Sequence, residues 1–246
     1  MNRCKSGYCC TKIEKLSVTK GSSSILHDVS FHIHCGQLIS IIGRNGTGKT
    51  TLLKALLGET KYTGNITFHD HHGNNKKLKI GYVPQKLNLD DNSPTSVYDF
   101  FAAYITNIPV FFIKSKSVYN KICEHLSKFN AENLIDKRLC DLSGGELQQV
   151  MLSLAMTPIP DILLLDEPVS AIDREGLEIF YKLLTELKVK NDIAIVIISH
   201  DFQHVRKYSD RVILLNKTVL KDDSPNIVLS SREFREEFRI NFSGGE

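Results

Sequence analysis

The sequence contains no run of 18 or more apolar residues, and residues 1–11 lack the apolar segment of a secretory signal. Because a helix needs about 20 apolar residues to cross a bilayer, we expect a cytosolic protein that does not span a membrane by itself. Strong charge is also missing. Thirty-one basic residues against 28 acidic ones give a net charge of +3, so nothing in the composition favours a nucleic-acid partner. Internal repeats and low-complexity segments are absent as well.

A metal-binding cysteine pattern is another missing feature. The sequence has six cysteines without a repeated C-x-x-C spacing: Cys4, Cys9, Cys10, Cys35, Cys123 and Cys140. In a reducing compartment this scatter predicts free thiols. The first three cysteines have the character of soft-metal ligands, but a frayed terminus is the simpler account of them. We therefore expect residues 1–11 to form a flexible N-terminus.

The 246 residues, 41% hydrophobic and 24% charged, suit one large domain over residues 12–240. Apolar and polar positions alternate over residues 12–35 around a Gly-Ser turn, which predicts two antiparallel strands. Residues 65–68 and 78–83 predict two further strands around a polar loop at 69–77. The histidines of that loop, from His69 to His72, have the character of zinc ligands, but a solvated hairpin tip needs fewer assumptions.

Helical periods replace this pattern from residue 96 to residue 139 and predict an inserted helical subdomain over about 93–140. Strand and helix then alternate, with continuous apolar runs at 162–165 and 193–198 on either side of a predicted helix at 174–187. Such runs are typical of parallel strands covered on both faces. The fold class is therefore α/β, with a mostly parallel sheet, an antiparallel β-subdomain and an α-helical insertion.

Residues 43–50 read Gly-Arg-Asn-Gly-Thr-Gly-Lys-Thr, the G-x-x-x-x-G-K-[ST] pattern of a phosphate-binding loop. The apolar run 38–42 precedes it and the helix-like segment 51–57 follows it. Backbone N–H groups of such a loop and the helix N-terminus attract an anion. Lys49 is expected to reach the β- and γ-phosphates, and the Thr50 hydroxyl to bind Mg²⁺. The predicted nucleotide-binding residues here are Gly43, Arg44, Asn45, Gly46, Thr47, Gly48, Lys49, Thr50 and Thr51.

Polar side chains follow three of the predicted strands. Asp166 and Glu167 come directly after the run 162–165, where Asp166 can hold Mg²⁺ and Glu167 can polarise a water for attack on the γ-phosphate. His200 follows the run 193–198 and is expected at the γ-phosphate. Gln85 follows residues 81–84 and offers an amide oxygen to the metal or to the attacking water. We therefore predict Thr50, Gln85 and Asp166 as Mg²⁺ ligands and Glu167, His200 and Gln85 as catalytic residues.

A second anion-binding helix start is predicted at residues 142–146. Ser143 is a good N-cap, and Gly144 and Gly145 leave backbone N–H groups bare toward an anion. Two such helix starts in one chain suggest that two chains share each nucleotide.

These motifs, in this order, resemble the ATP-binding subunits of ABC transporters over roughly residues 12–215. The resemblance implies a P-loop NTPase (RecA-like) core and a head-to-tail dimer in which residues 143–145 of one copy close over ATP on the other. It also implies Glu167 as the general base, His200 as the γ-phosphate contact and residues 170–173 as the D-loop. Lys20 stands where the family usually has an adenine-stacking aromatic, and it can contact the purine by a cation–π interaction.

The segment 79–90, and the tail 224–229 followed by 232–234, resemble the ATPases of bacterial zinc uptake systems, and less closely those for manganese or iron. The resemblance implies peripheral attachment to the cytoplasmic face of the inner membrane, through a separate permease, and cargo delivery by an extracytoplasmic binding protein. The helical insertion is expected to seat the permease with exposed aromatics among Phe100, Phe101, Phe111 and Phe112, while others of these four fill the subdomain's own core.

Each of the other ATPase classes differs from this chain in one feature of the sequence. Chromosome-maintenance and repair ATPases of this superfamily carry long coiled-coil heptads between the phosphate loop and the signature, and only 92 residues separate Thr50 from Ser143. Translation-type members carry two ATPase halves, and this chain carries one set of motifs. P-loop kinases and GTPases lack the segment 142–146.

Overall fold

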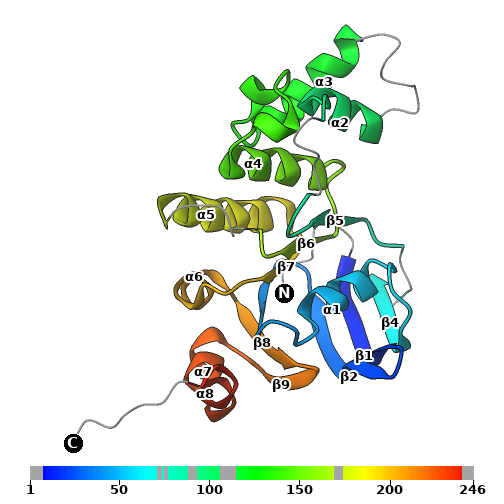
Figure 1. Cartoon of the computed structure of the whole chain (residues 1–246), viewed down its shortest axis with the longest axis vertical. Helices are drawn as coiled ribbons and strands as arrows, with labels where there is room; N and C mark the ends of the chain where they lie inside the picture. The colour runs from blue at the N-terminus through cyan, green and yellow to red at the C-terminus, as the bar shows by residue number, and fades with distance from the viewer. Residues whose placement is uncertain are drawn as a thin grey trace, which may run out of the picture.

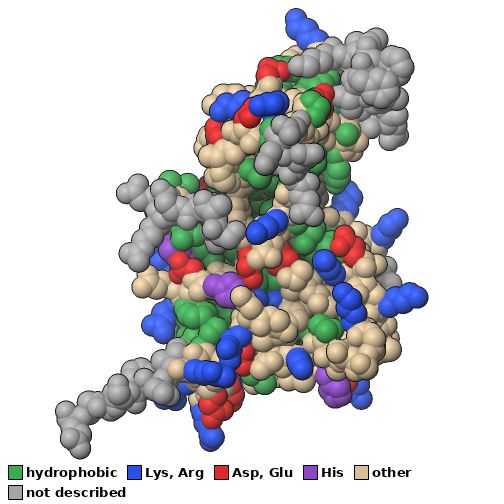
Figure 2. Space-filling model, in the orientation of Figure 1, with side chains coloured by type: hydrophobic (Ala, Val, Ile, Leu, Met, Phe, Trp, Pro, Cys, Tyr) green, Lys and Arg blue, Asp and Glu red, His purple; other side chains and the backbone are tan. Residues whose placement is uncertain are grey.

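The computed structural model describes residues 8–70, 74, 77–87, 93–105, 115–168 and 174–239, excluding the side chains of residues 8, 9, 174 and 175. A sheet-containing body carries a helical part at one end (Figure 1). On the face drawn in Figure 2, basic side chains are interspersed with acidic ones from the helical end to the opposite end, in keeping with the small net charge.

A six-stranded sheet in the order β5-β6-β7-β3-β8-β9 forms the centre of the body. Its neighbouring strands are parallel except for the final β8–β9 pair. The strands are β3 (Leu38–Ile42), β5 (Ile80–Val83), β6 (Ile162–Asp166), β7 (Ala194–Ile198), β8 (Arg211–Asn216) and β9 (Thr218–Asp223). Every residue of β3, β6 and β7 is buried, which confirms the prediction of a mostly parallel sheet.

The apolar runs of these strands are continuous because each face of the sheet has its own core. Leu164 of β6 packs in a cluster with residues of β1 (Tyr8–Lys20), β2 (Ser23–His34) and α1 (Lys49–Leu56), whereas its neighbour Leu163 packs with α5 (Arg174–Asn191). Alternate side chains of one strand point to opposite faces, so both must be apolar here. Three short helices complete the body: α6 (Phe202–Tyr208), α7 (Pro225–Ser230) and α8 (Arg232–Phe238).

A separate antiparallel sheet in the order β2-β1-β4 packs over α1. Its strands are β1 (Tyr8–Lys20), β2 (Ser23–His34) and β4 (Thr63–Asp70). The predicted hairpin at residues 65–83 is wrong, because β4 pairs with β1 while β5 belongs to the central sheet. His69 is thus the penultimate residue of β4, not a hairpin tip, and His71 and His72 lie outside the described residues.

The start of β1 also differs from the expectation of a flexible terminus through residue 11. Cys10 and Thr11 pair with β2 on one side and β4 on the other, so residues 8–11 belong to the sheet. This pairing sets the start of β1 beside the end of β2, where Cys35 is disulfide-bonded. The prediction of free thiols is therefore wrong for Cys35, whereas Cys10, Cys123 and Cys140 form no disulfide.

The predicted helical insertion consists of α2 (Val97–Ile105), α3 (Lys116–Ser127) and two 3₁₀ turns, and it packs on α4 (Gly144–Ala155). These elements bury a core of their own that includes Phe101, Leu126 and Val150. Phe101 is completely buried and Phe100 partly buried, so Phe101 is among those of the four aromatics that fill the subdomain's own core. Its apolar ring is used to hold the small subdomain together. Phe111 and Phe112 lie outside the described part of the chain.

Truncation of Phe101 to alanine is expected to lower the free energy of unfolding by about 3–5 kcal/mol, because it leaves a cavity in this small core. Tyr104→Ala on the same helix is the matched control, since Tyr104 is 58% exposed and exposed substitutions usually change stability by less than about 0.5 kcal/mol. Urea unfolding followed by circular dichroism measures both. Equal losses for the two variants would contradict the assignment of Phe101 to the core.

Candidate functional site

The phosphate loop links the end of β3 to the start of α1, at the carboxyl edge of the central sheet. Gly48 precedes α1 with φ +99°, a left-handed conformation that favours glycine. A Cβ atom at Gly48 would also lie 2.5 Å from the Leu26 side chain. A Cβ atom at Gly43 would collide with the carbonyl oxygen of Leu215. Both glycines are thus required by the packing of β2 and β8 against the loop.

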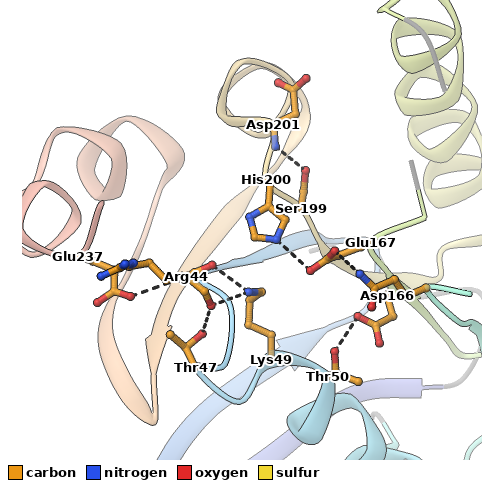
Figure 3. Close-up of polar contacts among 12 residues, drawn as sticks. Arg44, Thr47, Lys49, Thr50, Asp166, Glu167, Ser199, His200, Asp201 and Glu237 are labelled. Carbon is orange, nitrogen blue, oxygen red and sulfur yellow. Dashed lines mark hydrogen bonds and ion pairs between the residues drawn. The ribbon is translucent and has the colours of Figure 1, made fainter. Parts of the chain in front are cut away.

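Lys49 is nearly buried, with 5% exposure, and its ammonium is held by the loop itself (Figure 3). Its Nζ donates to the carbonyl oxygens of Gly43 and Arg44, each at 2.9 Å. Thr47 shapes the same turn, since its hydroxyl donates to the Arg44 carbonyl at 2.8 Å. Burial lowers the pKa of Lys49 below its usual value, and neighbouring carboxylates, first that of Glu167, oppose this shift.

Asp166 is the last residue of β6 and is 1% exposed. The hydroxyl of Thr50 donates to its Oδ1 at 3.1 Å, and the Tyr82 hydroxyl lies 3.5 Å from Oδ2. Burial raises the pKa of Asp166, and the hydrogen bond from Thr50 opposes the shift. Burial next to this carboxylate also raises the pKa of Tyr82 to about 12. Asp166 and Thr50 therefore meet as the sequence predicts.

The predicted catalytic side chains converge on Glu167. Its Oε2 accepts from the Gln85 amide nitrogen at 2.5 Å, and its Oε1 lies 2.9 Å from His200 Nε2 (Figure 3). Glu167 has φ +47°, a strained conformation for a residue other than glycine. Three segments that follow β5, β6 and β7 are thus joined at one carboxylate. Gln85 was predicted as a metal ligand as well, but the contact it makes is with Glu167.

A cavity of about 450 Å³ opens over the phosphate loop. Its lining comprises Ile25, Asn45, Gly46, Gly48, Lys49, Thr50, Thr51, Gln85 and Glu167. Every one of these except Ile25 was predicted from the sequence. Ile25 lies in β2 beside the loop, where its carbonyl approaches Gly48. No sequence signal marks it, because the approach depends on how the antiparallel sheet packs. Lys20, predicted to contact the purine, is not among the lining residues.

The second predicted helix start is capped by its own side chains. Ser143 is the N-cap of α4: its Oγ accepts from the Glu146 N–H at 3.3 Å, while Glu146 Oε2 accepts from the Ser143 N–H at 2.9 Å. Hydrogen bonds from Lys137 and Ser143 lower the pKa of Glu146 to about 2. This is a capping box, and its Ser-x-x-Glu signal was present in the sequence. Residues 143–145 do not line the cavity over the phosphate loop of the same chain.

Two further residues of this region were not predicted. Tyr82 contacts Asp166 from β5, and Glu237 of α8 contacts the backbone N–H of Arg44. The D-loop residues 170–173 and residues 88–90 after Gln85 lie outside the described residues.

The parallel sheet, the phosphate loop on a helix N-terminus and the carboxylates at the strand ends define a P-loop nucleotide-binding protein. The ABC transporter family model matches residues 26–170. The chain belongs to this family.

Curated relatives match most of the chain. It is 36% identical over 226 residues to the zinc import ATP-binding protein ZnuC of Wigglesworthia glossinidia brevipalpis, covering 92% of this chain and 91% of that protein. The protein of the same name from Cereibacter sphaeroides is 34% identical over 221 residues, covering 89% and 84%.

Solved structures share the fold. An ATP-binding cassette of an ABC transporter in its ADP conformation superposes with a TM-score of 0.78 at 22% identity, covering 93% of this chain and 98% of that one. A dimeric bacterial ABC transporter cassette gives 0.71 at 23% identity, covering 87% and 98%.

Replacing Lys49 by methionine is expected to weaken ADP binding by about 10- to 150-fold. A hydrogen bond to a charged group contributes about 1.5–3 kcal/mol, and methionine keeps the apolar stem but not the charge. The control is Lys54→Met, because Lys54 is an exposed residue of the same helix. Titration with a fluorescent ADP analogue measures both affinities, and unchanged binding by Lys49→Met would contradict the role of Lys49.

Proposed function

We propose that this chain is the ATP-hydrolysing, energy-coupling subunit of an importer for zinc(II). The observation that carries the proposal is the Glu167 carboxylate, held between Gln85 and His200 at the cavity over the phosphate loop. A carboxylate fixed beside the place of the γ-phosphate is what ATP hydrolysis needs as a base. The curated relatives named for zinc import support the choice of cargo.

Each residue of the site has a chemical role in this proposal. The phosphate loop binds the β- and γ-phosphates through its backbone N–H groups and through Lys49. Glu167 accepts a proton from the water that attacks the γ-phosphate. His200 and Gln85 orient Glu167 by donating to its two oxygens. The side chain of His200 is 42% exposed, so it can turn to contact the γ-phosphate.

The donors near the loop suit Mg²⁺, which prefers oxygen ligands. Thr50 and Asp166 already contact each other at 3.1 Å, and the amide oxygen of Gln85 is the third donor that we assign to the ion. When bound, Mg²⁺ neutralises charge on the β- and γ-phosphates. Burial raises the pKa of Asp166, and a cation bound beside it would favour the charged carboxylate.

A second copy of the chain completes the site in this proposal. Ser143 and Gly144 are exposed at the N-terminus of the twelve-residue helix α4, and Gly145 is half-buried. A Cβ atom at Gly145 would meet nothing within 4 Å, so packing within the chain does not require this glycine. A close approach by the phosphates bound to a partner copy does, and it places residues 143–145 over the partner's ATP in a head-to-tail dimer.

The remaining partners follow from the importer assignment. No helix in the described part of the chain is long and apolar enough to cross a membrane. We propose that a separate permease supplies the membrane path, that the helical insertion at about 93–140 and the segment after Gln85 dock on it at the cytoplasmic face of the bacterial inner membrane, and that an extracytoplasmic binding protein delivers zinc. No nucleic acid takes part.

Glu167→Gln is expected to bind MgATP but hydrolyse it about 10²–10⁴-fold more slowly, because the amide cannot accept the proton. The variant should also accumulate as a dimer with MgATP, measured by size-exclusion chromatography, since ATP is not consumed. Glu186→Gln on the exposed face of α5 is the control. Wild-type turnover by Glu167→Gln would remove Glu167 as the base.

Deletion of the gene is expected to impair growth in chelator-limited medium, and added zinc should relieve the defect. A plasmid carrying the wild-type chain should restore growth, whereas one carrying Lys49→Met should not, because transport requires bound nucleotide. Growth rate and cellular zinc content are the measurements. Relief by manganese or iron but not by zinc would overturn the cargo and leave the ATPase assignment intact.

A further inference from the structure

A carboxylate from the far end of the chain reaches the phosphate loop. Glu237 lies in α8 and is 9% exposed. Its Oε1 accepts from the backbone N–H of Arg44 at 3.4 Å, and its Oε2 accepts from the Asn216 side-chain amide at 2.8 Å (Figure 3 labels Glu237 and Arg44). Asn216 ends β8, so one carboxylate ties α8 to both the loop and the neighbouring hairpin.

The burial of Glu237 is not explained by the needs of its helix. The other two acidic residues of α8 are ion-paired near the surface: Glu233 lies 3.7 Å from Lys221, and Glu236 lies 2.6 Å from Arg232. Burying a carboxylate costs free energy unless hydrogen bonds compensate. Glu237 obtains those bonds from neutral N–H donors of the nucleotide site and its hairpin.

The bond to Arg44 fixes a single peptide plane of the phosphate loop. The N–H of Arg44 and the carbonyl of Gly43 belong to the same peptide unit, and a planar trans unit points them in opposite directions. Glu237 accepts from this N–H, and the carbonyl on the other side accepts from Lys49 Nζ at 2.9 Å. The direction of the N–H toward Glu237 therefore sets the direction of the carbonyl toward Lys49.

The β8–β9 hairpin, whose Asn216 donates to the same carboxylate, also contacts the phosphate loop directly. The backbone N–H of Lys217 donates to the carbonyl of Thr47 at 3.0 Å, and the carbonyl of Leu215 closely approaches Gly43. Asn216 stands between these two residues and donates to Glu237. The hairpin and α8 thus contact the phosphate loop at several points.

Aromatic packing fixes α8 in place. Phe234 and Phe238 pack edge-on against Phe202, with ring centroids 5.0 and 4.9 Å apart. Phe202 opens α6, two residues after His200. The helix that carries Glu237 therefore contacts both α6, which begins after His200, and the phosphate loop.

We propose that Glu237 is a positioning residue of the nucleotide site: it holds the Gly43–Arg44 peptide so that the Gly43 carbonyl faces Lys49 and the loop keeps its phosphate-binding shape before nucleotide arrives. The inference rests on the proposed ATP chemistry and adds α8 to the site. A loop ordered in advance binds more tightly because less ordering is needed on binding.

The test compares Glu237→Ala, Glu237→Gln and the control Glu236→Ala in the full chain. Glu237→Ala is expected to raise the dissociation constant of ADP and the KM for ATP about 5- to 50-fold, with kcat within about two-fold of wild type, because loop contacts act equally on ground and transition states. Glu237→Gln should restore near-normal binding, since its amide oxygen accepts from Arg44 and its nitrogen donates to a turned Asn216 amide.

A merely structural role of α8 predicts a different pattern. It lowers the melting temperature and kcat of Glu237→Ala without raising KM, and that result overturns the proposal. Equal dissociation constants for Glu237→Ala and Glu236→Ala also overturn it, as does a Glu237→Gln chain that binds as weakly as Glu237→Ala.

Asn216→Ala removes the other hydrogen-bond donor of the Glu237 carboxylate. Asn216 is exposed, so this variant is expected to fold even if Glu237→Ala does not. It frees Glu237 to turn away from Arg44, and a rise of about three-fold in the ADP dissociation constant is expected; no rise contradicts the proposal. A wild-type chain that binds nucleotide without hydrolysing it overturns the proposed function, while the dissociation constants still decide the role of Glu237.

Discussion

The hydrogen bonds between the Lys49 ammonium and the carbonyls of its own loop are the interaction on which the site depends. A nearly buried ammonium requires acceptors, and Gly43 and Arg44 supply them only if the loop turns back over the start of α1. That turn requires glycine at position 48, because β2 packs against it. The antiparallel sheet therefore helps to hold the shape of the loop as well as contributing to the core.

Charge at the carboxyl edge of the sheet is balanced across several strands. Asp166 ends β6 and Glu167 follows it. Burial, and next the charge of Glu167, raises the pKa of Asp166. Thr50 and Lys49 offset part of that cost. Glu167 leaves the strand in a left-handed conformation, which costs of order 1–3 kcal/mol in general. The hydrogen bonds from Gln85 and His200 hold it there, so the strain serves to aim the carboxylate.

Much of the fold was readable from the sequence because its signals are local. Buried parallel strands must be apolar on both faces, and the apolar runs at 162–165 and 193–198 predicted β6 and β7. The phosphate loop, the acids after β6 and the cap of α4 were found because each chemistry depends on a short, fixed spacing.

What the sequence did not reveal depends on contacts between distant segments. The strands at 65–68 and 78–83 were predicted correctly, but nothing in their own residues says that β4 joins β1 while β5 joins β6. Cys35, directly after β2, is disulfide-bonded, and no repeated cysteine spacing marks it in the sequence. Ile25 and Glu237 enter the site through packing of sheets and helices, and Glu237 lies 193 residues from its partner Arg44. An acidic residue on a short helix is usually a surface residue, so the sequence around Glu237 did not predict its burial.

The separation of the two anion-binding helix starts explains how such a site can do work. In one chain, the cavity over the phosphate loop is lined by Glu167, Lys49, Thr50 and Gln85, among others, but not by residues 143–145. In the proposed dimer, ATP contacts both copies, so it binds the closed arrangement more tightly than the open one. A ligand shifts a conformational equilibrium only by such a difference in affinity. Hydrolysis removes the γ-phosphate that contacts both copies, and the nucleotide then no longer favours the closed arrangement. In the proposed dimer, closure and opening therefore follow the binding and the hydrolysis of ATP.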